Sequence, residues 1–310
     1  MMYVMLLIGF FLLIKGADYF VEGSSSIAKL LRVPTVIIGL TVVAMGTSAP
    51  ELAVSITAAA SGNNAIALSN VLGSNLFNLL VVAGACAAVI PLAVADEILR
   101  RDFPLSTVLT GVLFLLCIAD REVGRLDGCL LFGILIVYLY VLIRQALNRR
   151  KPEEEKVIQG IRRSPAVSVG FILGGIIAIV WGGDLVVDNA SRIAGRFGLS
   201  QTLIGLTIVA MGTSLPELVT SVVAARKGEK DMAMGNVIGS NLFNLLAVLG
   251  LSAAIHPVGV EWSSLCDMGI LLGCSAAVWL LCRKSGQLNR RCGIGMLAAY
   301  AGYTAYIIVR

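Results

Sequence analysis

The stretch VAMGTSAPEL, residues 43–52, places a glycine, a proline and a glutamate inside an otherwise apolar segment. The same pattern returns as VAMGTSLPEL at residues 209–218, an offset of 166 residues. A carboxylate in the middle of a membrane costs on the order of 2.5 to 3.5 kcal/mol. The repeated glutamates, Glu51 and Glu217, therefore indicate a function rather than packing.

The composition is that of an integral membrane protein. The chain has 310 residues, of which 57% are hydrophobic and 14% are charged, and its mean hydropathy is +0.89. A water-soluble globule of this size would need more polar surface. The first apolar run lacks the basic start and small-residue cleavage site of a signal peptide, so we expect it to remain as a transmembrane helix. Ten apolar runs suit a hydrocarbon layer about 30 Å thick, at 2–21, 35–60, 65–90, 104–119, 127–145, 166–186, 202–225, 232–256, 265–282 and 292–309.

The basic residues predict the orientation in the membrane. Eighteen of the 24 lysines and arginines fall in alternate loops, and this number includes those in the stretch 144–164. The positive-inside rule places these loops in the cytoplasm and both termini outside. Topology accounts for the basic residues, so no nucleic-acid partner is expected. The small size and short linker favour a prokaryotic inner membrane.

The repeat extends over the whole chain. Residues 39–52 match 205–218 in twelve of fourteen positions, and 70–80 match 236–246 in ten of eleven. Two halves, 1–143 and 165–310, thus hold five predicted spans each and flank a cytoplasmic linker, 144–164, which we interpret as a tether, with a regulatory patch as the alternative.

Because each half has an odd number of crossings, the second half enters the membrane from the opposite side. The predicted fold is therefore an all-α membrane protein with ten transmembrane helices in two inverted five-helix repeats, with helices 2, 3, 7 and 8 broken. Inverted repeats with interrupted helices are typical of secondary transporters, whose binding site lies near the midplane.

The prolines explain how the repeated segment can bind a cation. Pro50 and Pro216 have no N–H, so the carbonyl four residues earlier loses its helical partner. Such a break persists in hydrocarbon only where protein, water or a ligand satisfies the backbone. Glu51 and Glu217 then fall in the first turn of a new half-helix, whose dipole favours the ionised carboxylate.

Oxygen-bearing groups accompany the glutamates, with no thiolate or imidazole among them. Hard oxygen ligands favour Ca²⁺, Na⁺ or Mg²⁺ over soft transition metals. For Ser74, Asn75, Ser240 and Asn241, helix-to-helix packing is an equally strong interpretation. The candidate groups are the backbone carbonyls of 44–47 and 210–213 and the side chains of Thr47, Ser48, Ser74, Asn75, Asn78, Thr213, Ser214, Ser240, Asn241 and Asn244.

Other ionisable and reactive residues are not expected at the site. Asp18 and Asp184 form a second repeated acidic pair near helix ends, where a capping or gating contact is the preferred interpretation. The seven cysteines are scattered through apolar segments without metal-type spacing, and His256 has no partner in the sequence. A channel would need a filter-like run of carbonyls, and an intramembrane hydrolase would need a nucleophile with a base. The sequence shows neither feature. The chain is thus predicted not to be an enzyme.

With its signatures GTSAPE, GTSLPE and two copies of GSNLFN, the chain resembles the sodium/calcium exchangers of the calcium/cation antiporter superfamily, in particular the compact prokaryotic calcium/sodium antiporters. The resemblance implies alternating access, in which the first and sixth helices slide across the others. It also implies a shared cation site built on Glu51 and Glu217 and lined by Thr47, Ser48, Ser74, Asn78, Thr213, Ser214, Ser240, Asn244 and the carbonyls of Ala44 and Ala210.

The resulting prediction is a Na⁺/Ca²⁺ antiporter without a resident cofactor. Its partners are Ca²⁺, Na⁺ and the lipid bilayer, and a monomer is the expected state. The alternative is a Ca²⁺/H⁺ exchanger of the same superfamily, or a transporter of other divalent cations such as Mg²⁺. Several relatives carry an aspartate where this chain has Asn244, and the neutral pair Asn78 and Asn244 argues against potassium co-transport.

Overall fold

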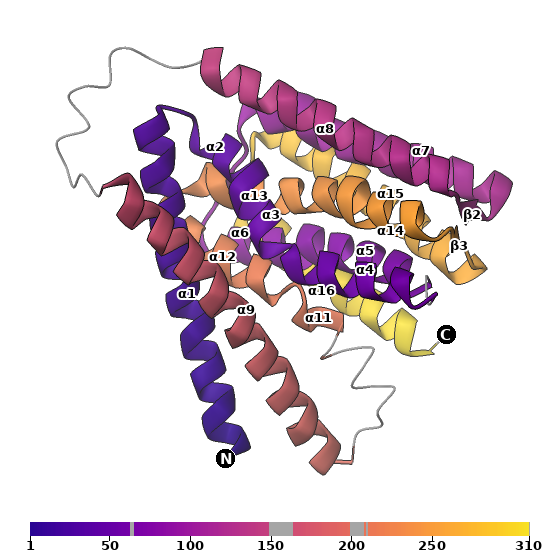
Figure 1. Ribbon diagram of the computed structural model, residues 1–310, viewed down its shortest axis with the longest axis horizontal. Coiled ribbons are helices and arrows are strands. Elements are labelled where there is room, and N and C mark those ends of the chain that lie inside the picture. The colour runs from indigo at the N-terminus through magenta and orange to yellow at the C-terminus, as the bar shows by residue number, and fades with distance from the viewer. Residues whose placement is uncertain (63–64, 149–163, 199–207, 209, 310) are drawn as a thin grey trace.

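The molecule is a bundle of helices (Figure 1), and the computed structural model describes residues 1–62, 65–148, 164–198, 208 and 210–309. The α-helices are α1 (Met2–Leu31), α2 (Thr35–Ile38), α3 (Ala44–Thr47), α4 (Ala49–Ala60), α5 (Ala65–Phe77), α6 (Ala83–Val89), α7 (Phe103–Asp120), α8 (Arg125–Asn148), α9 (Pro165–Arg196), α11 (Ala210–Gly212), α12 (Leu215–Arg226), α13 (Lys230–Phe243), α14 (Leu249–Ile255), α15 (Trp262–Ser285) and α16 (Arg290–Val309). The π-helical turns are η1 (Gly39–Val43), η2 (Asn78–Val82), η3 (Ile98–Asp102) and η6 (Asn244–Val248).

Most of these helices have the length and composition of membrane spans. In the described part of the chain, eight helices are long and apolar enough to cross a membrane, and a ninth span is added if the bent pair Thr35–Thr47 and Ala49–Ala60 counts as one. The chain is therefore a multi-pass membrane protein. The remaining predicted span, 202–225, begins among residues 199–207 and 209, which lie outside the described residues. The number of ten spans therefore stays a prediction.

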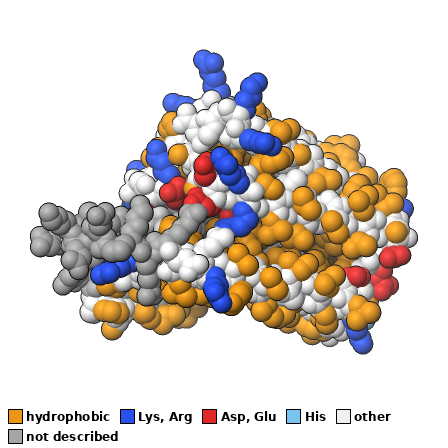
Figure 2. Space-filling view, turned by 90° about the horizontal axis from the view of Figure 1, so that it is seen from above, with side chains coloured by type: hydrophobic (Ala, Val, Ile, Leu, Met, Phe, Trp, Pro, Cys, Tyr) orange, Lys and Arg blue, Asp and Glu red, His pale blue; other side chains and the backbone are white. Residues whose placement is uncertain are grey.

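Two spans form the centre of the bundle. In Ile66–Val89 and Lys230–Ile255, 78% and 83% of the residues in the apolar window are buried, against 17–39% in the six other long spans. The peripheral spans instead expose leucine, isoleucine and valine, as expected of helices that face lipid. Figure 2 shows hydrophobic side chains over much of the visible face, with Lys and Arg gathered mainly in its left half. Because the two central spans contain both copies of the GSNLFN motif, these motifs lie in the core.

Helices α1 and α9 pack closely along each other at one edge of the bundle (Figure 1). Glycines make this possible: a Cβ on Gly9 would lie 2.9 Å from the carbonyl oxygen of Gly182, and one on Gly16 would lie 2.9 Å from that of Gly175. Small residues commonly allow such close contact between membrane helices. The two predicted sliding helices thus contact each other as a pair.

Two short sheets join loops that are far apart in the sequence. Strand β1 (Leu92–Ala93) pairs with β4 (Gln287–Leu288), and β2 (Glu122–Val123) pairs with β3 (Val258–Gly259). The distribution of basic residues predicts that β1 and β4 lie on the cytoplasmic side of the membrane and that β2 and β3 lie on the outer side. Each pairing therefore agrees with the predicted orientation of the loops.

The predicted helix breaks are present only where the sequence has proline. The pair that contains Pro50 bends by 49°, and Thr213 and Ser214 form a turn between α11 and α12, which contains Pro216. The prediction of broken third and eighth helices was wrong. Residues Ile66–Val89 and Lys230–Ile255 each form one continuous span. These spans contain no proline, and a π-helical turn that begins at Asn78 or Asn244 replaces the break.

Candidate functional site

The two glutamates lie at equivalent positions in two half-helices. Glu51 is in the first turn of α4 and Glu217 is in the first turn of α12, and each follows a proline at the start of its helix. Proline is favoured there because the first N–H groups of a helix have no intrahelical acceptor. Both carboxylates are fully buried, with 0% exposure. The positive ends of two helix dipoles thus stabilise two negative charges inside the bundle.

Two serines connect the glutamates across the halves. The Ser48 hydroxyl donates to Glu217 Oε1 over 2.8 Å, and the Ser214 hydroxyl donates to Glu51 Oε1 over 3.1 Å. Ser48 lies directly before α4 and Ser214 directly before α12, so each serine binds the carboxylate of the other half. The two hydrogen bonds are equivalent, because the offset of 166 residues between the repeats relates Ser48 to Ser214 and Glu51 to Glu217.

Several buried oxygens around these carboxylates have no hydrogen-bond partner. Buried polar groups in folded proteins are nearly always paired, so a cluster of unpaired oxygens indicates a site for a ligand. All four repeated signatures contribute: their buried oxygens without a partner among the described residues are Glu51 Oε2, Glu217 Oε2, Ser74 Oγ, Ser240 Oγ, Asn78 Oδ1, Asn241 Oδ1, Asn244 Oδ1 and Thr213 Oγ1.

The elements that carry these oxygens pack against one another. Helix α4 lies against α5 and η6, and α12 lies against α13 and η2. Each glutamate-bearing half-helix therefore meets the serine-bearing helix of its own half and the asparagine-bearing turn of the other half. The fold thus gathers the predicted side chains in the core, where water is excluded.

The threonine and alanine positions differ between the halves. The Thr47 hydroxyl lies 3.1 Å from the Val43 carbonyl oxygen, 3.3 Å from that of Ala44 and 3.1 Å from Asn236 Oδ1. The Ala44 carbonyl also accepts the N–H of Ser48 over 3.0 Å.

In the second half, the Thr213 hydroxyl has no hydrogen-bond partner among the described residues, and the equivalent of Val43 is residue 209, outside the described part. Ala210 is the first residue of α11 and follows a residue outside the described part.

Sequence reasoning missed a pair of supporting asparagines. Asn70 donates to Ser55 Oγ over 2.9 Å and to the carbonyl oxygen of Glu51 over 3.2 Å, and Asn236 donates to Ser221 Oγ over 2.9 Å. These bonds fix α4 on α5 and α12 on α13. Both asparagines begin the repeated block NVLGSN or NVIGSN, so the repeat itself was a signal for them.

The donor set suits a hard cation. Two carboxylates and neutral hydroxyl and amide oxygens are ligands of the kind that Ca²⁺ and Na⁺ take. Throughout the described residues, no three His, Cys, Asp or Glu side chains gather as a metal-holding group. The groups available to a cation here are thus the two carboxylates and neutral oxygens.

The second acidic pair lies elsewhere. Asp18 forms an ion pair with Lys227, with 2.5 Å between Oδ1 and Nζ, and Asp184 is exposed. His256 Nδ1 lies 3.1 Å from the carbonyl oxygen of the neighbouring Pro257. Asp18, Asp184 and His256 all lie outside the four repeated signatures.

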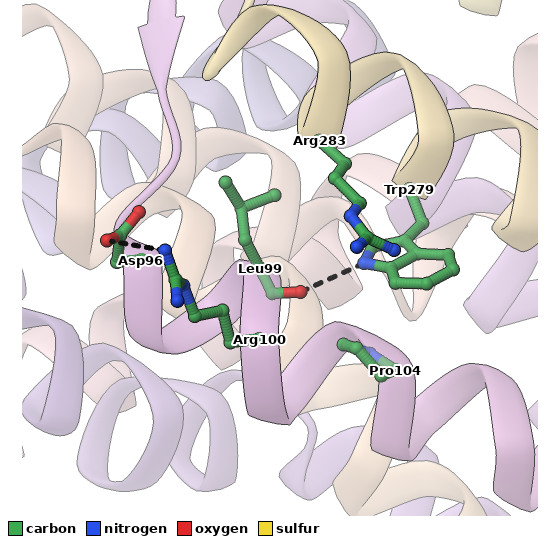
Figure 3. A pocket seen from close by; sticks show the side chains of 6 residues that line it. All are labelled: Asp96, Leu99, Arg100, Pro104, Trp279 and Arg283. Atoms are coloured by element: carbon green, nitrogen blue, oxygen red, sulfur yellow. Dashed lines mark hydrogen bonds and ion pairs between the residues drawn. The ribbon is translucent and has the colours of Figure 1, made fainter.

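A pocket of about 440 Å³ lies away from the glutamates, between η3, the start of α7 and the last turns of α15 (Figure 3). In it, Trp279 Nε1 donates to the Leu99 carbonyl over 2.9 Å, and the Arg283 guanidinium lies 5.4 Å from the Trp279 ring centroid. Arginine and tryptophan are typical where a helix leaves the membrane. The pocket thus marks the end of a span.

Comparisons with known proteins agree on one family. The family described as sodium/calcium exchanger protein matches residues 1–144 and 167–309. The chain is 40% identical to the putative antiporter CaxA of Alkalimonas amylolytica, over 97% of this chain and 96% of that protein. It is 32% identical to the sodium/calcium exchanger MaX1 of Methanosarcina acetivorans, over 97% of both chains. A solved structure of the sodium-calcium exchanger NCX_Mj, soaked with zero Na⁺ and Ca²⁺, superposes with a TM-score of 0.86 and 29% identity, covering 99% of this chain and 98% of that one.

Proposed function

The chain belongs to the sodium/calcium exchanger family, and we propose that it is a secondary-active antiporter that exchanges Na⁺ for Ca²⁺ by alternating access. The observation that carries this proposal is the pair of buried glutamates, bridged reciprocally by Ser48 and Ser214 and surrounded by unpaired oxygens. The family is one of exchangers, which are transporters, and this is consistent with the prediction that the chain is not an enzyme.

Charge balance explains why the two cations compete. Glu51 and Glu217 together carry two negative charges, which one Ca²⁺ or two Na⁺ neutralise. Because both cations need the same carboxylates, binding of one excludes the other, and the site crosses only in a loaded and neutralised state. Any third Na⁺ would rest on neutral oxygens such as those of Asn78 and Asn244, and transport would then move net charge.

Reciprocal contacts support two inverted halves around the site. Besides the serine–glutamate bonds, Asn75 and Asn241 each donate to the other's carbonyl over 3.3 Å, and the glycine contacts between α1 and α9 are reciprocal as well. A two-fold relation between halves produces self-complementary contacts of this kind. With ten spans the axis lies in the membrane plane, the termini lie outside and the linker 144–164 lies in the cytoplasm.

Sodium-driven calcium uptake tests the counter-ion. Sodium-loaded vesicles that contain the purified protein are expected to accumulate Ca²⁺ when both sides are held at one pH by buffer and a protonophore. Uptake should be unchanged without K⁺, because Asn78 and Asn244 are neutral. The measurement is radioactive calcium uptake with empty vesicles as the control. Uptake that stops once the pH gradient is collapsed would instead establish the Ca²⁺/H⁺ alternative.

The two sides of the bundle are closed to different extents. Helix α12 packs along α1, and Thr220 on α12 is fully buried, whereas the equivalent Val54 on α4 is 42% exposed. Lys227 at the end of α12 also contacts Asp18 and Glu22 of α1, with 2.5 and 4.0 Å between charged atoms. The equivalent of Lys227 in the first half is Ser61, which carries no charge. These contacts support a conformation closed toward the cytoplasm.

Lys227→Gln is expected to weaken this closure. A partly exposed ion pair contributes at most about 1 kcal/mol, so the half-saturating concentration of outside Ca²⁺ should rise by no more than about five-fold. Calcium uptake in vesicles of known orientation measures this shift. Arg226→Gln removes a charge from the same helix end without breaking an ion pair of the described residues, and it should leave the value unchanged. Equal effects of both variants would argue against the closure.

A further inference from the structure

We propose that Asn75 is a positioning residue that fixes the side-chain oxygen of Asn244 as a cation ligand, and that the equivalent bond is missing for Asn78. This inference rests on the proposed function, because it concerns the same site. It assigns different roles to Asn75 and Asn241, which occupy the same position in the two identical GSNLFN motifs.

The orientation of Asn75 follows from its first partner. Asn75 Nδ2 donates to the carbonyl oxygen of Asn241 over 3.3 Å. A backbone carbonyl can only accept, so the amide nitrogen of Asn75 must face it and the amide oxygen must face the other way. Asn75 is 1% exposed, so bulk solvent does not compensate a reversed amide.

The orientation of Asn244 follows in turn. Asn75 Oδ1 lies 3.1 Å from Asn244 Nδ2, which donates to it. With its nitrogen fixed by Asn75, the amide of Asn244 must turn its oxygen away. That oxygen is buried and has no partner. Because the turn that Asn244 begins packs against the helix of Glu51, the free oxygen is available to an ion bound there.

The first half lacks this arrangement. Asn241 donates to the Asn75 carbonyl over 3.3 Å, as the repeat requires. However, Asn241 Oδ1 is unpaired, and both Nδ2 and Oδ1 of Asn78 are unpaired as well. Asn75 and Asn241 therefore connect the central helices equally, but only Asn75 also orients a neighbouring asparagine.

A fixed neutral ligand matters most for the divalent ion. Ca²⁺ takes six to eight oxygen ligands, and the two carboxylates supply only part of them. A ligand that is held in place before binding lowers the cost of ordering it on binding. Asn75 thus raises the affinity for Ca²⁺ through Asn244, whereas no hydrogen bond of the described residues fixes the amide of Asn78.

The test compares Asn75→Ala with Asn241→Ala. Each variant removes one asparagine from the same central contact and one bond to a backbone carbonyl, but only the first releases Asn244. We expect Asn75→Ala to raise the half-saturating Ca²⁺ concentration about three- to ten-fold, the range of one hydrogen bond, with a nearly unchanged maximal rate. Asn241→Ala should lower the thermal unfolding midpoint of the ion-free protein similarly but raise this concentration less than Asn75→Ala does. Equal rises in both variants would overturn the proposal.

A double-mutant cycle gives a second, independent test. If Asn75 acts through Asn244, Asn75→Ala should add little in a protein that already carries Asn244→Ala, but its effect should be additive with that of Asn78→Ala. Additivity with both would contradict the inference. Should Asn75→Ala fail to fold, Asn75→Asp keeps the oxygen that accepts from Asn244, and its half-saturating concentration should not exceed that of the unaltered protein. A rise would again overturn the proposal.

Ca²⁺-induced stabilisation against heat separates this inference from the proposed function. It reports binding without transport. If Glu217→Gln leaves that stabilisation intact, the carboxylate site itself is wrong. If Glu217→Gln abolishes it while Asn75→Ala and Asn241→Ala behave alike, only the role of Asn75 is wrong.

Discussion

Glu217→Gln is expected to abolish sodium-driven calcium uptake, with a loss of more than about 100-fold. The substitution removes one of two negative charges from a fully buried site and keeps the size of the side chain. Removal of one member of a buried charge interaction costs about 3 to 5 kcal/mol, which corresponds to this loss of affinity for the cation. Calcium uptake into sodium-loaded vesicles measures the effect directly.

Asp184→Asn is the control for this variant. It also neutralises an acid within a long apolar helix, but Asp184 is exposed and distant in sequence from both signatures. Transport should persist at close to its normal rate. A Glu217→Gln protein that is folded and still exchanges the two cations would contradict the site, whatever the control does.

Gly239→Ala is expected to destabilise the protein by about 1 to 3 kcal/mol, the usual cost of overpacking a core. An added Cβ would lie 2.8 Å from both the Cα and the carbonyl oxygen of Leu40 and 2.9 Å from the Cβ of Ala44. Backbone atoms cannot yield as a flexible side chain can, so α13 must move away from the segment that leads to Ser48. The unfolding midpoint of the purified protein should fall accordingly.

Gly73→Ala provides a matched comparison, because Gly73 is the equivalent of Gly239 in the first half. Among the described residues, a Cβ added there meets no atom within 4 Å. Alanine is also the better helix former by about 1 kcal/mol. The unfolding midpoint should therefore be unchanged or raised. Similar losses in both variants would show that the two motifs have equivalent surroundings, against the structure.

The positions of the two glutamates in the fold could be predicted from the sequence. Glu51 and Glu217 were singled out because an ionisable side chain next to a proline is costly in hydrocarbon, and the structure buries both at the start of half-helices. The proline break at residue 50 was predicted correctly, because the missing N–H is a local property. The continuous helices through Asn78 and Asn244 were not predicted, because a π-helical turn has no comparable residue signal.

Atomic partners could not be predicted in the same way. The sequence contains two equal copies of GSNLFN, yet Asn244 has a partner in Asn75 while Asn78 has none among the described residues. The Thr47 hydroxyl similarly lies 3.1 Å from Asn236 Oδ1 of the other half. These contacts arise from packing between helices that are more than a hundred residues apart in the chain.

The sequence by itself determined the membrane class, the duplication and the placement of two carboxylates at the starts of half-helices, since hydropathy, helix periodicity and the chemistry of proline act over a few neighbouring residues. Only the tertiary structure decided that Ser48 binds the glutamate of the other half, that Gly239 packs against the backbone of Leu40, and that Asn244 donates to Asn75. The physical reason is that identical motifs receive different neighbours once the helices pack, and the free energy of a buried polar group depends on those neighbours.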